Sequence, residues 1–323
     1  MRSLITGIGG VVGSYLAEEL LTGGNTEVWG VVRKGPGHAA HLQDRLRLVE
    51  ADLTDPQRTE AIVDEVRPER VYHLAGQSDV GGSWRTPWAT FETNVRAQLN
   101  MLEALARLKL DTRVLVVGSQ EEYGKVRREE LPTSEEAPLR PDSPYGVSKV
   151  AQDLLGLQYF QSYKVHTVRV RPFNHIGPRQ SDRFVAAAFA RQIAEAEAGL
   201  REATMLVGNL DSARDFTDVR DVVHAYRLVL DLGQAGEVYN VGSGKAYRIR
   251  ALLGILLDLS SAEIAVSTDP GRLRPADVRM TRADTSKIRA AAGWEPLIPF
   301  ERSVQEVLEY WRAQARAQGA GSK

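Results

Sequence analysis

Short apolar runs alternate with longer amphipathic stretches along the first half of the chain. The apolar runs predict six strands, at Ser3–Thr6, Val28–Val32, Leu46–Ala51, Arg70–Leu74, Arg113–Val117 and His166–Arg171. The stretches between them predict helices over Val12–Thr22, Pro56–Val66, Trp88–Arg107 and Pro144–Tyr163. Strands that alternate with helices form right-handed crossovers, and near-continuous Val, Ile and Leu are typical of strands covered on both faces. The pattern therefore predicts an α/β fold built on a doubly wound parallel sheet.

The pattern changes after about Arg171. Helix-like segments are now separated by short, isolated strands and by loops that contain Pro and Gly; they are Asp182–Gly199, Val219–Leu232, Ile249–Leu257 and Phe300–Ala315. We therefore expect two domains, the first over residues 1–171 and a smaller C-terminal α/β lobe over residues 172–317, with chain segments free to interleave. Residues 318–323 are expected to form a frayed tail.

Composition excludes several classes of protein. Hydrophobic residues make up 43% of the 323 residues and charged residues 26%, which is ordinary for a globular enzyme. The formal net charge of −1 offers no basic surface for nucleic acid or an anionic membrane, and the absence of cysteine excludes disulfides and thiolate metal sites. No apolar run approaches the roughly 20 residues of a membrane span, and no signal peptide is readable. We expect a cytoplasmic protein without a metal, nucleic-acid or membrane partner.

A glycine-rich turn follows the first predicted strand and opens the first predicted helix. It has the pattern T-G-x-x-G-x-x-G over Thr6–Gly13. In such turns the first glycine (Gly7) permits the tight bend, the second (Gly10) lets the backbone approach a pyrophosphate, and the third (Gly13) lets the helix pack closely. The helix N-terminus then offers free N–H groups to the phosphates. We predict that this turn binds a dinucleotide cofactor.

The end of the second predicted strand indicates which dinucleotide is bound. A site for NAD would carry an acidic residue here for the ribose hydroxyls, but the chain has Val32, Arg33 and Lys34. A guanidinium favours a 2′-phosphate, so we predict NADP(H), with NAD(H) as a possible substitute; the alternative is that Arg33 is a solvated loop charge. After the third strand, Asp52 could accept a hydrogen bond from the adenine amino group, or it could cap the helix that begins near Pro56.

Three residues form a candidate catalytic set. Tyr145 and Lys149 are four residues apart, which places them on one face of a predicted helix. A free phenol has a pKa of about 10, and a nearby ammonium together with a cationic nicotinamide favours the phenolate, which would bring Tyr145 towards the working pH as an acid or base. Ser119 follows the strand Arg113–Val117, at the carboxyl edge where such sheets bind ligands. We predict redox chemistry at a carbonyl or alcohol carbon, with Lys149 also binding the nicotinamide ribose.

Together these segments resemble the extended short-chain dehydrogenase/reductases, the nucleotide-sugar epimerase/dehydratase superfamily, over essentially the whole chain. The segments that carry the resemblance are Thr6–Gly13, Asp52-Leu53, His73–Ser78, Asn94, Ser119, Tyr123-Gly124, Tyr145, Lys149, Arg171–His175, Arg214–Val219 and Tyr239–Gly242. The resemblance implies a Rossmann domain followed by a substrate lobe. It also implies a homodimer that pairs through helices near Trp88–Arg107 and Pro144–Tyr163.

The resemblance also implies further binding residues. For the cofactor it adds Leu53, Leu74, Ala75, Gly76 and Asn94. For the substrate, a nucleotide-diphosphate sugar, it adds Gln77, Ser78, Asn174, Arg179, Arg214, Arg274 and Asp277. The physical reason for the arginines is that a diphosphate needs positive charge and forked donors; for any single arginine the alternative is a solvated surface charge.

Within the family, three segments look most like reductases that form GDP-rhamnose from GDP-4-keto-6-deoxymannose: Gly118–Gly124, Asn174–Gln180 and Leu273–Val278. The alternatives are a GDP-mannose 4,6-dehydratase, or another nucleotide-sugar reductase or epimerase. A dehydratase needs a further base, which in this family is a Glu two residues after the Ser or Thr, and Glu121 occupies that place. The reductases carry Glu there too, so Glu121 is catalytic only in the dehydratase hypothesis. A non-catalytic NADP-binding protein would be expected to lose the Tyr145 and Lys149 pair.

Overall fold

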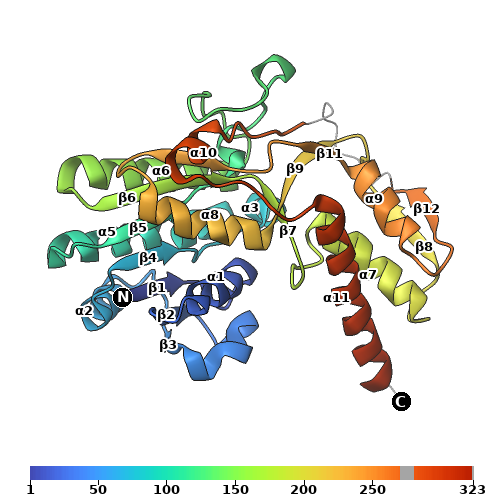
Figure 1. Cartoon of the computed structure of the whole chain (residues 1–323), viewed down its shortest axis with the longest axis horizontal. Helices are drawn as coiled ribbons and strands as arrows, with labels where there is room; N and C mark the ends of the chain where they lie inside the picture. The colour runs from blue at the N-terminus through green and yellow to red at the C-terminus, as the bar shows by residue number, and fades with distance from the viewer. Residues whose placement is uncertain (270–279, 322–323) are drawn as a thin grey trace.

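The main sheet has seven strands, all parallel, in the order β10-β6-β5-β4-β1-β2-β3 (Figure 1). The computed structural model describes residues 1–269 and 280–321. The strands are β1 (Arg2–Thr6), β2 (Glu27–Val32), β3 (Arg47–Glu50), β4 (Arg70–His73), β5 (Arg113–Val117), β6 (His166–Pro172) and β10 (Val238–Val241). From β1 the chain winds outward through β2 and β3, then returns to build β4, β5 and β6 on the other side. The predicted doubly wound Rossmann-type fold is confirmed.

Helices cover both faces of this sheet. One face packs against α1 (Val11–Thr22), α8 (Val219–Leu232) and α10 (Ser286–Ala292), and the other against α2 (Pro56–Val66), α5 (Ala97–Leu108) and α6 (Pro144–Tyr163). The two apolar cores are separate because successive side chains of each strand point to opposite faces. Ile5 belongs to the core under α1 and α8, for example, whereas Leu4 belongs to the core under α2 and α5.

The predicted helix Trp88–Arg107 is a composite in the structure. The chain forms a short α3 (Val80–Arg85), then α4 (Pro87–Phe91), a π-helical turn over Glu92–Arg96, and α5. A π turn holds one extra residue and is common near functional sites. Here it contains Asn94, which is fully buried.

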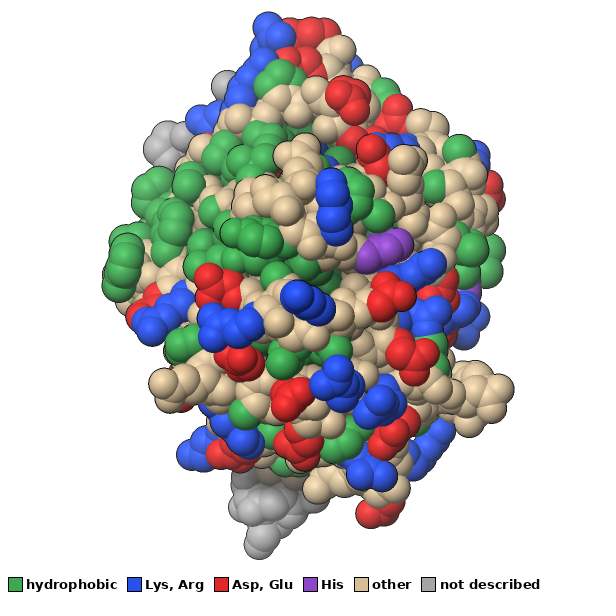
Figure 2. Space-filling model, turned by 90° about the vertical axis from the view of Figure 1, so that its left-hand side faces the viewer, with side chains coloured by type: hydrophobic (Ala, Val, Ile, Leu, Met, Phe, Trp, Pro, Cys, Tyr) green, Lys and Arg blue, Asp and Glu red, His purple; other side chains and the backbone are tan. Residues whose placement is uncertain are grey.

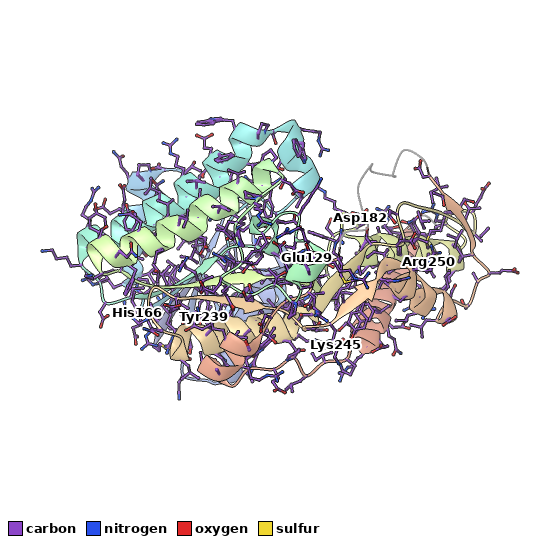
Figure 3. The ribbon with its side chains drawn as sticks, turned by 90° about the horizontal axis from the view of Figure 1, so that it is seen from above. Glu129, His166, Asp182, Tyr239, Lys245 and Arg250 are labelled. Carbon is purple, nitrogen blue, oxygen red and sulfur yellow. The ribbon has the colours of Figure 1, made fainter. Side chains whose placement is uncertain are left out.

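The second unit has its own core. Helices α7 (Val185–Glu197), α9 (Ile249–Asp258) and α11 (Phe300–Gly321) pack on two small sheets, β11-β9-β7 and β12-β8. The strands are β7 (Asn174–Ile176), β8 (Thr204–Val207), β9 (Ala213–Asp218), β11 (Ala246–Arg248) and β12 (Ala265–Thr268). Phe300 lies at the centre, with its ring centroid 4.0 Å from that of Tyr247 and 5.5 Å from that of Phe216. Seen from above, this unit, which carries Arg250, lies beside the main sheet, which carries His166 (Figure 3).

Chain order and spatial grouping differ beyond residue 171. Strand β10 pairs with β6, and helices α8 and α10 cover the main sheet, so these later segments belong to the first unit. The C-terminus also differs from expectation. Helix α11 continues to Gly321, past Gln318, where the tail was expected to begin; the helix packs along α7, where Arg312 binds Glu197.

Two features are missing from the part of the chain that the structure describes, a membrane-spanning helix and a metal-binding cluster. None of their helices combines the length and apolarity that crossing a membrane requires. Nor do these residues contain a group of three His, Asp or Glu side chains arranged to hold a metal ion.

Candidate active site

The glycine-rich turn lies at the carboxyl edge of the main sheet. Gly7 has a φ of 71°, and a Cβ atom there would lie 2.9 Å from the main chain of Ala75. At Gly13 a Cβ would lie 2.5 Å from the carbonyl oxygen of Gly7. The Gly10 N–H closes the turn by donating to that same carbonyl at 3.0 Å. At Gly7 and Gly13 the turn therefore has no space for a side chain.

The helix that follows presents an open N-terminus. Gly10 is the N-cap residue of α1, and no side chain accepts from the first N–H groups of the helix. Uncapped N–H groups together with the helix dipole form an anion site. This cradle fits the diphosphate of a dinucleotide.

The loop after β2 carries the candidate 2′-phosphate residue. Arg33 and Lys34 are both exposed. The strand itself ends without an acidic residue, but the Glu50 carboxylate of β3 accepts from the Gly35 N–H at 3.3 Å. Asp52, after β3, accepts from the N–H and the hydroxyl of Thr54 at 2.9 and 2.8 Å, and these bonds, with the Arg33 charge, lower the pKa of Asp52. Asp52 does not cap α2; Asp55 does, by accepting from the N–H groups of two helix residues.

Asn94 supports the loop after β4 from behind. Its Oδ1 accepts from the Gln77 N–H at 2.7 Å, and its Nδ2 donates to the Ser148 hydroxyl at 3.0 Å. On the same loop, the Ala75 N–H donates to the Thr6 hydroxyl at 3.1 Å. These bonds hold the segment Leu74–Gln77 against the first strand and α6, so Asn94 shapes the predicted cofactor loop from below. Leu53 packs its side chain into the core below α2.

Ser119, Tyr145 and Lys149 meet at the end of β5. Ser143 caps α6 by accepting from the Gly146 N–H, and Pro144 occupies the first turn, so the helix starts just before Tyr145. The Tyr145 phenol hydrogen-bonds with the Ser119 hydroxyl. The Lys149 Nζ donates to the Val117 carbonyl at 2.9 Å and lies 5.8 Å from the centroid of the Tyr145 ring. The structure thus brings the three predicted catalytic residues together.

Burial sets the protonation of this trio. Burial raises the pKa of Tyr145 above that of a free phenol, and the hydrogen bond from Ser119 only partly opposes the rise. Burial also lowers the pKa of Lys149 to about 8, against the attraction of Glu122. Tyr145 is therefore held in its protonated, proton-donating form. The hypothesis that an ammonium and a cationic nicotinamide together favour the phenolate concerns the enzyme with bound cofactor and stays a prediction.

Two neighbours of Ser119 border the trio. The Glu121 carboxylate is close enough to Tyr145 to contribute to the rise in the pKa of the phenol. Gln120 is buried and donates through its Nε2 to the Oδ1 of Asn174 at 2.7 Å. The predicted substrate residue Asn174, on β7, is thereby joined directly to the catalytic strand end.

The other predicted substrate residues are spread over the molecule. Arg179 reaches α1, where its guanidinium makes two bonds to the Glu18 carboxylate, at 2.8 and 3.1 Å, and lies 3.6 Å from the centroid of the Tyr15 ring. The structure does not bring it to Arg214, which lies on β9 of the second unit. Ser78 is exposed on the loop after β4, beside Gln77. Arg274 and Asp277 lie outside the described residues.

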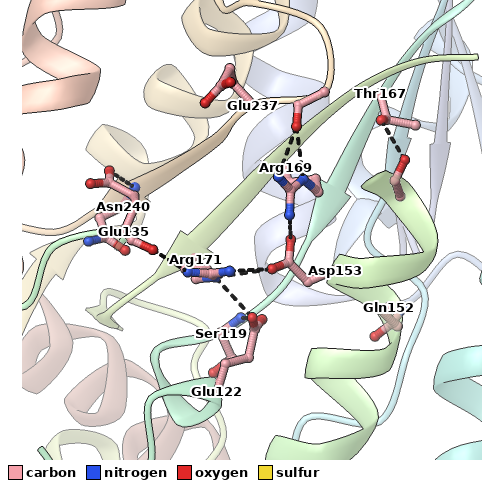
Figure 4. A network of polar contacts seen from close by, with 12 residues as sticks. Ser119, Glu122, Glu135, Gln152, Asp153, Thr167, Arg169, Arg171, Glu237 and Asn240 are labelled. Atoms are coloured by element: carbon pink, nitrogen blue, oxygen red, sulfur yellow. Dashed lines mark hydrogen bonds and ion pairs between the residues drawn. The ribbon is translucent and has the colours of Figure 1, made fainter. Parts of the chain in front are cut away.

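A buried charge network next to the trio was not foreseen from the sequence (Figure 4). Glu122 accepts from the Ser119 N–H at 2.7 Å and binds Arg171, which also binds Asp153 of α6. All three charged side chains are at most 5% exposed. One signal existed: Ser119 and Glu122 have the S-x-x-E spacing of a capping box, and the structure forms that box. Nothing in the sequence pattern indicated that Arg171 and Asp153 would meet it.

Comparison with known proteins gives the same family as the motifs. Residues 4–307 match the family described as GDP-mannose 4,6 dehydratase. The chain is 37% identical to a GDP-6-deoxy-D-mannose reductase of Pseudomonas aeruginosa over 98% of each chain. It is also 31% identical to a GDP-mannose 4,6-dehydratase of Vibrio cholerae, covering 95% of this chain and 92% of that one.

Solved structures share the fold. RMD of Pseudomonas aeruginosa, in complex with NADPH, superposes with a TM-score of 0.85 at 35% identity, covering 97% of this chain and 99% of that one. A UDP-glucose 4-epimerase of Thermotoga maritima with UDP-glucose gives 0.86 at 27% identity over the same shares. The resemblance inferred from the motifs is therefore confirmed, and the chain belongs to the GDP-mannose 4,6 dehydratase family of the extended short-chain dehydrogenase/reductases, which are NAD(P)-dependent enzymes of nucleotide sugars.

Proposed function

We propose that this enzyme reduces the C4 keto group of GDP-4-keto-6-deoxy-D-mannose with NADPH to give GDP-D-rhamnose. The observation that carries the proposal is the 37% identity, over 98% of both chains, with a GDP-6-deoxy-D-mannose reductase. The protonated state of Tyr145 supports it, because reduction of a ketone needs a proton donor at the carbonyl oxygen.

The roles of the trio follow from its geometry. Bound NADPH supplies a hydride to the keto carbon. Tyr145 protonates the oxygen, and the Ser119 hydroxyl, already bonded to the phenol, orients that oxygen. Lys149, fixed by the Val117 carbonyl, keeps positive charge beside Tyr145 and stabilises the negative charge that develops during transfer.

We assign the cofactor to the glycine-rich turn and the loops beside it. Gly7, Gly10 and Gly13 leave room for the diphosphate at the open end of α1, and Arg33 is the candidate for the 2′-phosphate. For the substrate we assign Asn174, on β7, together with Gln77 and Ser78 on the loop after β4, and Arg214 would bind the diphosphate. Arg274 and Asp277 remain assigned to the substrate by resemblance alone.

A second candidate function is the 4,6-dehydration of GDP-mannose. The specific observation in its favour is Glu121, whose carboxylate lies near the Tyr145 phenol and could remove a proton from C5 of the sugar. In that reaction the cofactor is regenerated within each turnover, so no net consumption of NADPH occurs.

Two parallel incubations separate the candidates. One contains GDP-mannose with NADP⁺, and the other contains GDP-4-keto-6-deoxymannose with NADPH. We expect no reaction in the first, and in the second a loss of absorbance at the NADPH maximum equal to the product formed, identified as GDP-D-rhamnose by NMR. Water elimination from GDP-mannose without net cofactor change would assign the dehydratase function and make Glu121 the base.

We also propose that the enzyme is a homodimer. Large apolar side chains are exposed on α4 and α6, among them Trp88 (77% exposed), Leu154 (50%) and Val147 (42%). Hydrophobic side chains also gather on the left-hand side of the face in Figure 2. Contiguous exposed apolar surface of this kind is typical of interfaces. Light scattering of the parent and of Leu154→Glu tests the proposal, since the charged variant should be monomeric.

We also propose that the enzyme is cytoplasmic, because its proposed substrate is a nucleotide sugar.

A further inference from the structure

The Glu122 carboxylate lies on the main chain that carries the catalytic serine. Its Oε1 accepts from the Ser119 N–H at 2.7 Å. A Cβ atom added to Gly118 would lie 2.1 Å from that same oxygen, so the carboxylate occupies the space that a side chain at residue 118 would need. The side chain of Glu122 is itself fully buried. The buried Glu122 carboxylate therefore fills the space beside Gly118 and accepts a hydrogen bond from the main chain of the catalytic serine.

Three hydrogen bonds hold the main chain of Val117, Gly118 and Ser119, the segment that precedes the turn containing Glu122. The Val117 carbonyl accepts from Lys149 at 2.9 Å, the Gly118 N–H donates to the Val170 carbonyl at 2.8 Å, and the Ser119 N–H donates to Glu122. Lys149 and Glu122 thus hold opposite ends of the same short segment. The Ser119 hydroxyl projects from the end that Glu122 holds.

Arg171 fixes the other oxygen of Glu122. Its Nε donates to Oε2 at 3.0 Å, and its guanidinium also binds Asp153, the Tyr123 hydroxyl and the Glu135 carbonyl. Asp153 lies on α6, one turn beyond Lys149. The carboxylate is therefore held by a guanidinium that is itself fixed to the helix of Tyr145 and Lys149, so the serine and that helix share one support.

From this arrangement we propose that Glu122 is a positioning residue of the active site, which fixes the main chain of Ser119 relative to the helix of Tyr145 and Lys149. The proposal rests on the proposed reductase function for its kinetic test. Glu122 touches neither substrate nor cofactor in this scheme; it acts through Ser119.

The role of Glu122 does not depend on its charge. Burial and the Asp153 carboxylate raise the pKa of Glu122 above its usual range, although the Arg171 guanidinium and the Ser119 N–H oppose the rise. A carboxyl oxygen accepts a hydrogen bond in both protonation states. Oε1 can therefore hold the Ser119 N–H whether or not Glu122 is ionised.

Two substitutions at this position test the role. Glu122→Gln keeps the size and one oxygen acceptor for the Ser119 N–H, and Glu122→Leu removes that acceptor. We expect Glu122→Gln to keep kcat within a few-fold of the parent. We expect Glu122→Leu to lower kcat by roughly 10²-fold, since misplacement of a catalytic group by about 1 Å has that effect, with KM for NADPH changed far less.

The matched control is Arg169→Met. Arg169 is buried in the same network and binds Asp153 at 3.0 Å, but it has no bond to the segment Val117–Glu122. It should lower the midpoint of thermal unfolding yet leave kcat close to that of the parent. A loss of kcat as large as that of Glu122→Leu would overturn the proposal, because general loosening of the network would then explain both.

A second readout needs no substrate. Hydrogen exchange of the peptide that contains Val117–Tyr123 is measured by mass spectrometry. We expect faster exchange in Glu122→Leu than in the parent or in Glu122→Gln, because the Ser119 N–H loses its acceptor. Unchanged exchange or an unchanged kcat in Glu122→Leu would overturn the proposal. A parent enzyme that fails to reduce the 4-keto sugar would overturn the proposed function alone, because the exchange would still decide the role of Glu122.

Discussion

The catalytic edge of the main sheet and the arginines expected to bind the substrate differ in how they are built. Ser119, Tyr145 and Lys149 come from one strand end and the first turns of one helix, and the structure brings them together. The arginines come from separate segments: Arg179 binds Glu18 of α1, whereas Arg214 lies on β9. Local geometry places the first group, whereas the position of each arginine depends on partners far away in the sequence.

The contrast has an energetic side. The catalytic trio is buried, and burial changes the pKa of both Tyr145 and Lys149. Arg33, on the predicted cofactor loop, is exposed, whereas the Arg179 guanidinium forms an ion pair with Glu18 of α1. Charge changes at the trio should therefore affect chemistry strongly, while those at the arginines should affect binding and remain sensitive to salt.

The largest effect is expected for Tyr145→Phe. Loss of a general acid lowers the rate roughly 10²–10⁴-fold, while the phenyl ring keeps the packing of the first turn of α6. We expect kcat to fall by that factor and the Kd for NADPH, measured by fluorescence, to stay within about twofold. Turnover close to that of the parent would exclude Tyr145 as the proton donor.

The two arginines give the next largest effect, and they sharpen the comparison most. Arg214→Gln should raise KM for the nucleotide sugar roughly 10–100-fold, since a charge-assisted hydrogen bond contributes about 1.5–3 kcal/mol. Arg179→Gln should leave that KM within a few-fold and instead lower the midpoint of thermal unfolding, because it removes the Glu18 ion pair and the contact with Tyr15. Steady-state kinetics and thermal unfolding of both variants check this. The reverse result would place Arg179 on the substrate after all.

A smaller effect is expected at the cofactor loop. Arg33→Asp should reduce the preference for NADPH over NADH by roughly tenfold, because a carboxylate repels the 2′-phosphate and accepts from ribose hydroxyls. The measurement is kcat/KM with each cofactor, with Lys34→Asp as the neighbouring control. Equal losses with both cofactors would show that Arg33 does not read the phosphate.

The smallest effect is expected in the pH dependence of kcat/KM, which should fall at basic pH. With the pKa of Lys149 lowered to about 8, the ammonium that supports proton transfer is half lost at that pH. We expect kcat/KM to fall to about half its plateau near pH 8 and then tenfold per unit, whereas the phenol of Tyr145, whose pKa is raised, should stay protonated there. Lys149→Met should have a lower plateau and lack this limb. A limb that persists in Lys149→Met would belong to another group.

The sequence by itself determined the elements whose geometry is local. The alternation of apolar runs and amphipathic stretches predicted the parallel sheet, because strands covered on both faces are apolar throughout. The spacing of Gly7, Gly10 and Gly13 predicted a turn free of side chains. The four-residue spacing of Tyr145 and Lys149 predicted one helix face, and these features needed no knowledge of distant contacts.

Only the tertiary structure decided the remainder. In the folded chain β10 and α8 belong to the main unit, because their apolar faces are buried there. Glu122, Arg171 and Asp153, which lie on three different elements, meet in one network. The tertiary structure also raises the pKa of Tyr145, because the packed chain removes water from around the phenol. Long-range contacts and desolvation arise from the packed chain as a whole, and a local spacing in the sequence does not encode either of them.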